Sequence, residues 1–74
     1  MEDRAALTQF LHTLSVQELR IIQQAVNCRV YGKRSRRLDL LHAIEAHDQR
    51  YGFSRGQAKA LLDHHELLYA GHNT

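Results

Sequence analysis

A short basic stretch in the middle of the chain is the densest group of residues that could bind a ligand. Five of the ten Lys and Arg residues lie between positions 29 and 37, and this stretch contains no acidic residue. Arginine donates charge-assisted, often bidentate hydrogen bonds to phosphate oxygens, and lysine supplies a compact positive charge. We therefore expect a phosphate-binding surface here. Its candidate residues are Arg29, Tyr31, Gly32, Lys33, Arg34, Ser35, Arg36 and Arg37.

Glycine and serine in this stretch predict how its backbone would meet an anion. Ser35 is a candidate N-cap for a helix that follows it. A helix N-terminus offers free amides and a partial positive charge, and Gly32 would let the backbone approach a ligand closely. The helix dipole disfavours cations at this end, so Arg36 and Arg37 in the first turn indicate an anionic partner that compensates them.

The elements that would position these residues are all helical. Apolar residues recur at helical spacing along nearly the whole chain, which predicts an all-α fold. A first helix is expected over about residues 3–13. Ser15 and Glu18 form a capping box that opens a second helix, which ends near Asn27 and Cys28.

A third helix is expected after Ser35, and Gly52 is suited to end it as a left-handed cap. Its core face would present Leu38, Leu41 and Ile44, with His47 or Asp48 at the edge. A fourth helix is expected over residues 54–70, with Ser54 as its cap and Gly71 closing it. Its core face would be Ala58, Leu61, Leu62, His65, Leu68 and Tyr69.

Chain length and composition fit one domain over residues 1–74, built as a compact bundle of three to four short helices. The apolar fraction is 43%, enough for one modest core, and the chain has no proline and only four glycines. No stretch approaches the roughly 20 apolar residues of a membrane span, and the polar, acidic start is unlike a signal peptide. Together with the lone Cys28 this predicts an intracellular protein that does not associate with membranes.

The segment from Leu14 to Ile44 resembles a SAP domain, a helix–linker–helix module that binds DNA, often AT-rich DNA. The resemblance covers about 31 of the 74 residues. It is carried by Leu14-Ser15-Val16, Glu18-Leu19-Arg20, Val26, Cys28, Val30, Gly32-Lys33-Arg34, Leu38, Leu41 and Ile44. Asn27 stands where the family usually has glycine, and the leucines after Gly32 fall about one residue late. The resemblance implies that the basic linker and the start of the third helix face DNA.

Other side chains that could do chemistry do not form a recognisable motif. His64 and His65 are adjacent and so point about 100° apart on a helix, while His42 and His47 lack the i, i+4 spacing of a helical metal pair. Cys28 has no thiol or histidine nearby in the sequence and is interpreted as a packing residue. We therefore expect no catalytic residues, no metal site and no cofactor, and a protein that is not an enzyme.

The leading hypothesis is a non-catalytic DNA-binding module, either regulatory or architectural, with RNA as the less favoured ligand. A DNA-binding protein of this kind would be located in the nucleus or the nucleoid. The alternative is a helical interaction module that binds a protein partner or a second copy through Leu67, Leu68 and Tyr69 of the C-terminal helix. A further alternative is a helix-turn-helix role for the fourth helix, with Arg55, Gln57 and Lys59 facing the groove of the DNA.

Overall fold

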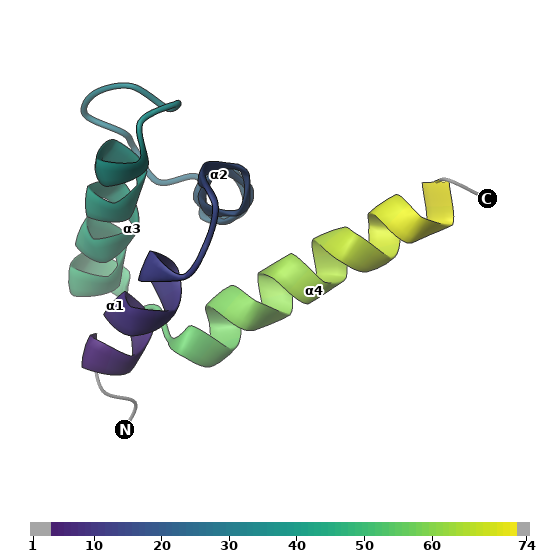
Figure 1. Cartoon of the computed structure of the whole chain (residues 1–74). Coiled ribbons are helices and arrows are strands. Elements are labelled where there is room, and N and C mark those ends of the chain that lie inside the picture. Colours follow the sequence, from purple (N-terminus) through teal and green to yellow (C-terminus); the bar gives the residue numbers. More distant parts are fainter. Residues whose placement is uncertain (1–3, 73–74) are drawn as a thin grey trace.

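The fold of the chain is all-α, as predicted. The computed structural model describes residues 4–72, with side chains described through residue 66. Its helices are α1 (Arg4–His12), α2 (Val16–Val26), α3 (Arg37–Tyr51) and α4 (Arg55–His72). Helix α2 packs against both α3 and α4, and α1 also contacts both. Figure 1 shows that α4 begins beside α1 and that its later turns extend beyond the other three helices.

One hydrophobic core joins the four helices. Among the described residues its fully buried members include Leu7 and Leu11 from α1, and Leu19 and Ile22 from α2. Helix α3 contributes Leu40, Leu41 and Ile44 to the core, and α4 contributes Ala58. Leu61 and Leu62 pack against this core while half-buried. His65, also predicted on this face, is half-buried. The predicted core positions Leu68 and Tyr69 lie outside the described side chains.

Helix α2 is fixed at both ends by local hydrogen bonds. The Ser15 hydroxyl accepts from the Glu18 amide at 3.1 Å, and the Glu18 carboxylate accepts from the Ser15 amide at 3.0 Å, which confirms the predicted capping box. At the other end Asn27 takes a left-handed conformation with φ 55° and ψ 38°. Asparagine tolerates this conformation better than most residues, so Asn27 can occupy a position that usually needs glycine.

Helix α3 begins later than the sequence predicts. Its N-cap is Arg36, with no side-chain cap hydrogen bond, so the prediction that Ser35 caps the helix is wrong. The core-facing side of the helix shifts accordingly. Leu38 is 55% exposed, whereas Leu40 is fully buried. The predicted core position of Leu38 is therefore wrong, while Leu41 and Ile44 are buried as expected.

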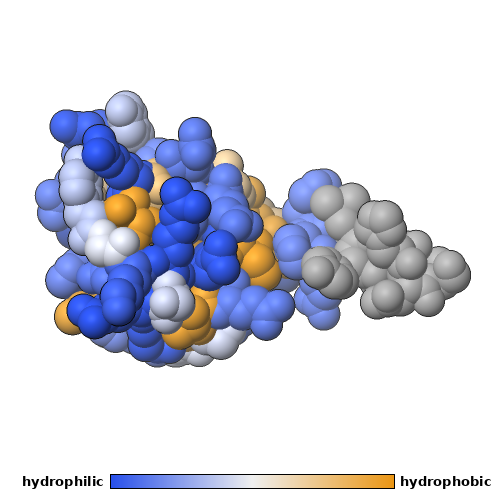
Figure 2. Space-filling model, turned by 90° about the horizontal axis from the view of Figure 1, so that it is seen from above, coloured by the Kyte–Doolittle hydropathy of each residue, from blue (hydrophilic) through white to orange (hydrophobic). Residues whose placement is uncertain are grey.

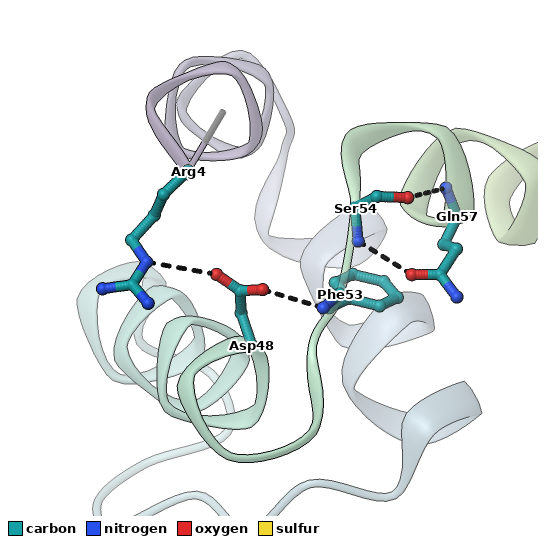
Figure 3. A network of polar contacts seen from close by, with 5 residues as sticks. All are labelled: Arg4, Asp48, Phe53, Ser54 and Gln57. Carbon is teal, nitrogen blue, oxygen red and sulfur yellow. Dashed lines mark hydrogen bonds and ion pairs between the residues drawn. The ribbon is translucent and has the colours of Figure 1, made fainter. Parts of the chain in front are cut away.

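The corner between α3 and α4 is held by polar contacts (Figure 3). Gly52 ends α3 as predicted, and its amide donates to the carbonyl of Asp48. Its φ of 82° is positive, but its ψ of 131° lies outside the left-handed helical region, so the predicted left-handed conformation is wrong. The Asp48 carboxylate accepts from the Phe53 amide at 2.8 Å. Ser54 and Gln57 form a second reciprocal capping box that opens α4. At its far end α4 continues through Gly71 to His72, so the prediction that Gly71 ends the helix is wrong.

Two sequence-based expectations concern the outer part of α4 and membrane association. The proposed partner surface of Leu67, Leu68 and Tyr69 lies outside the described side chains. Of the helices in the described part of the chain, none combines the length and the apolar character needed to cross a bilayer.

Candidate nucleic-acid interface

The candidate site is the loop of residues 27–36 that joins α2 to α3, and its start is fixed by a buried glutamine. The Gln23 side chain is 6% exposed, and its amide nitrogen donates to the carbonyl oxygen of Cys28 at 2.7 Å. The Cys28 amide in turn donates to the Gln23 carbonyl at 3.3 Å. These two bonds hold the first loop residues against the end of α2, so the loop leaves the helix in a defined direction.

The end of the loop is fixed by an acidic residue in the first turn of α3. The Asp39 carboxylate accepts from the backbone amide of Lys33 at 2.9 Å. The Arg36 amide donates to the Lys33 carbonyl at 3.0 Å, which closes a turn over residues 33–36. Gly32 lies so close to Asp39 that an added Cβ would be within 3.0 Å of the carboxylate. Gly32 thus allows the close approach of Asp39, whereas its predicted role was to allow the close approach of a ligand.

Cys28 and Val30 of the loop pack against the core, whereas most of its other side chains are exposed. We define the loop surface as Arg29, Tyr31, Lys33, Arg34 and Arg36, all of which are exposed. The Arg29 guanidinium lies over the Tyr31 ring, 5.1 Å from its centroid. Figure 2 views the molecule from above, the side on which the loop lies in Figure 1, and this face of the body is mostly hydrophilic. The loop therefore presents four cations and one aromatic ring to solvent.

Arg37 is engaged differently from the other predicted phosphate-binding residues. Its guanidinium donates to the backbone carbonyls of His12, the last residue of α1, and of Leu14, two residues further on. The side chain is half-buried, in contrast to the exposed cations of the loop surface. Arg37 thus ties the start of α3 to the α1–α2 connection. We therefore leave it out of the loop surface.

Asp39 also changes the electrostatic argument for an anionic partner. From the sequence, Arg36 and Arg37 in the first helical turn indicate an external anion. In the structure the Asp39 carboxylate lies 3.9 Å from Nε of Arg36, and Arg37 is satisfied by carbonyl oxygens. Part of the positive charge at the start of α3 is therefore compensated by groups of the protein itself. Arg36 keeps 62% of its side chain exposed, so this long contact leaves it accessible.

Sequence reasoning missed Asp39, although a signal for it was present. An acidic residue within the first turn of a helix is favoured by the helix dipole and can accept hydrogen bonds from the preceding backbone. Asp39 stands three residues after the N-cap Arg36, the same spacing as Glu18 after Ser15. Its carboxylate, however, reaches back to Lys33 instead of the cap residue. That longer reach depends on the shape of the loop.

Cys28 and the histidines are the other side chains whose chemistry could form a site. Burial raises the pKa of the Cys28 thiol above its ordinary value, while a backbone hydrogen bond lowers it by less. The thiol packs beside the core and is half-buried. Within the described part of the chain, no three His, Cys, Asp or Glu side chains are grouped so that they could hold a metal ion.

Comparisons of the chain with protein-family models, with curated proteins and with solved structures give no match. The SAP resemblance therefore remains a prediction. Its helix–linker–helix arrangement corresponds here to α2, the loop and α3.

Proposed function

We propose that this domain binds the phosphate backbone of DNA through the loop surface, without catalysis. The observation that carries this proposal is the set of four exposed cations on one loop whose backbone is held by Gln23 and Asp39. A pinned loop presents its cations without a large ordering cost on binding. Charge-assisted hydrogen bonds to phosphate contribute strongly to affinity, but they do not distinguish one base from another. The domain would thus bind DNA with weak sequence preference.

A titration against a short AT-rich duplex at two salt concentrations tests the proposal. Four phosphate contacts give a slope of log K against log salt of roughly −3.6. We expect binding to be measurable at about 50 mM salt and to weaken steeply above it. Absence of binding at the lower concentration would contradict the proposal, because electrostatic contacts are strongest there.

A pair of charge-matched variants locates the binding surface. Lys33→Glu with Arg34→Glu should abolish binding, whereas Arg55→Glu with Lys59→Glu on α4 should reduce it only slightly. Each exchange changes the net charge by −2, so both double variants go from +2 to −2. Equal losses in the two variants would show that net charge alone governs binding. A larger loss in the α4 variant would favour the helix-turn-helix hypothesis.

The alternative function, binding of a protein partner, is supported by a different face of the molecule. An open groove of about 540 Å³ lies beside α4. Its apolar lining includes Phe10, Leu14, Ile21 and Leu62, and its carboxylates are Glu18, Asp63 and Glu66, against one lysine, Lys59. Such a lining suits an amphipathic helix with basic edges. A photo-crosslinker at Gln17, an exposed residue of the groove, would capture such a helix if this alternative holds.

A further inference from the structure

A second groove lies between the loop and the C-terminal half of α3, and it is open to solvent. Its volume is about 580 Å³, within the range of small-molecule sites. Tyr31 borders it from the loop and Tyr51 borders it from the end of α3. These two tyrosines are 80% and 74% exposed, and they are among the few large apolar side chains with such exposure in the described part of the chain. The groove therefore has an aromatic ring on each of the two elements that form it.

Each of these rings is held by a neighbour. The Arg29 guanidinium lies 5.1 Å from the centroid of Tyr31. The His47 ring lies 5.1 Å from the centroid of Tyr51 and is itself 6.0 Å from the buried Phe53 ring. These contacts restrain the tyrosines while leaving most of their surface in water. Exposed aromatic rings of this kind are suited to stacking against a flat ligand.

The charges around the groove identify the class of flat ligand. Arg29 and Arg50 line it, and its described lining contains no Asp or Glu. The small side chains of Ala43 and Ala46 also line the groove. Arg29 belongs to both this groove and the loop surface, so a strand held by the loop can continue into the groove. A ligand that combines flat rings with regularly spaced negative charges fits this lining.

We propose that this groove binds unpaired nucleotides of a single-stranded nucleic acid, with bases stacking on Tyr31 and Tyr51. Bases within a duplex are stacked on one another and do not offer their faces, whereas bases of a single strand do. Arg29 and Arg50 contact the phosphates on either side. The inference rests on the proposed function, because the loop surface supplies most of the phosphate contacts.

Two variants outside the loop surface test the groove. Tyr51→Ala removes one ring, and Ala46→Leu fills the space on an exposed part of α3 with a good helix former. Tyr51→Phe is the matched control, because it keeps the ring. The ligands are a short oligothymidylate, an oligouridylate of equal length, and an AT-rich duplex. We expect Tyr51→Ala to weaken binding of the thymidylate roughly 5- to 100-fold, with Tyr51→Phe close to wild type.

Duplex binding and fluorescence separate this inference from the proposed function. Tyr51→Ala and Ala46→Leu should leave duplex affinity within about twofold of wild type. Because the chain has no tryptophan, tyrosine emission is observable, and its quenching by the oligonucleotide should diminish in Tyr51→Ala. A comparison of thymidylate with uridylate shows whether DNA or RNA strands are preferred.

The groove proposal is overturned if neither Tyr51→Ala nor Ala46→Leu changes the affinity for single strands. It is also overturned if these variants weaken the binding of single strands and of the duplex to the same extent. In these two cases intact duplex binding by the wild type would leave the proposed function standing. If the wild type binds no nucleic acid at all, both proposals fail.

Discussion

The Asp39 carboxylate occupies the space beside Gly32 in which a side chain would otherwise begin. From there it accepts the hydrogen bond of the Lys33 amide at 2.9 Å, and its own side chain is 18% exposed. The two residues are therefore coupled. Asp39 can reach the loop backbone only because position 32 has no Cβ, and the loop keeps its shape because Asp39 is there.

Gly32→Ala should destabilise the domain by about 2 kcal/mol, because the added Cβ meets Asp39 and the backbone φ of 157° is unfavourable for other residues. Gly52→Ala is the control. Gly52 also has a positive φ, 82°, but its added Cβ would meet nothing within 4 Å. Any excess cost at position 32 after allowance for backbone strain comes from the close approach of Asp39. Urea unfolding followed by circular dichroism measures both losses.

The coupling between the two residues predicts non-additive stability. Asp39→Ala alone should cost about 1–2 kcal/mol, because the Lys33 amide loses its acceptor. In the double variant with Gly32→Ala the new methyl group finds room, so the combined loss should be smaller than the sum of the two single losses. Strict additivity would mean that the Gly32 and Asp39 positions act independently.

Arg37→Ala and Arg36→Ala should separate stability from binding. Arg37 donates to the carbonyls of His12 and Leu14, so its removal should cost about 2 kcal/mol of unfolding free energy. Arg36 has only a long ion pair, 3.9 Å from Asp39, and its removal should leave stability within about 0.5 kcal/mol. The effects on duplex binding should be reversed. Arg36→Ala should reduce the magnitude of the slope of log K against log salt by about 0.9, and Arg37→Ala should leave this slope unchanged.

The same paired measurement can contradict the assignment. A stable Arg37→Ala protein with a salt slope of smaller magnitude would place Arg37 on the binding surface, in agreement with the prediction from the basic run.

Local sequence rules recovered most of the helix boundaries. The capping box of Ser15 and Glu18 and the caps at Gly52 and Ser54 are set by residues no more than four positions apart. Such contacts form wherever the local spacing is right, so spacing alone predicts them. The all-α fold follows from the same local regularity.

The register of α3 and the role of Arg37 could not be read in this way. The spacing of apolar residues allows either Leu38 or Leu40 to face the core. In the structure Leu40 is buried and Leu38 is exposed, and the helix is capped at Arg36 instead of Ser35. The carbonyl partners of Arg37 lie 23 and 25 residues earlier in the chain. A cation in a basic run looks the same in sequence whether it faces solvent or a distant carbonyl.

Asp48 should matter more for stability than the arginine with which it pairs. Its carboxylate accepts from the Phe53 amide at 2.8 Å and lies 3.5 Å from Nε of Arg4 (Figure 3). The Asp48 side chain is 14% exposed and that of Arg4 is 66% exposed, so the ion pair is screened by water. Asp48→Ala should cost about 1–2 kcal/mol by leaving the Phe53 amide without its acceptor. Arg4→Ala should cost less than about 0.5 kcal/mol.

Asp48→Asn is the matched control for this comparison. It keeps an oxygen that can accept from the Phe53 amide while removing the charge. Thermal unfolding of the three variants should therefore place Asp48→Asn close to Arg4→Ala. If Asp48→Asn is instead as damaging as Asp48→Ala, the charge of Asp48 matters more than its hydrogen bond.

Cys28 gives the domain a specific alkaline pH dependence. Burial disfavours the thiolate and raises the thiol pKa in the folded state, so the folded protein keeps a proton that the unfolded chain has lost. Stability from this group is constant below the unfolded pKa, about 8.5, and decreases as the pH rises toward the folded pKa. Cys28→Ala should remove this part of the decrease. The difference between wild type and variant, measured by urea unfolding with reductant from neutral to alkaline pH, isolates it from other titrating groups.

The thiol itself provides an independent measurement of the same effect. The rate of alkylation by iodoacetamide follows the thiolate fraction, so its pH midpoint should be higher in the folded protein than in the urea-unfolded chain. Partial burial should also slow the reaction at every pH. Equal midpoints in the two states would contradict the raised pKa, and the wild type and Cys28→Ala should then lose stability in parallel at alkaline pH. A higher folded midpoint with no stability difference would show that burial of Cys28 is already present in the unfolded ensemble under native conditions.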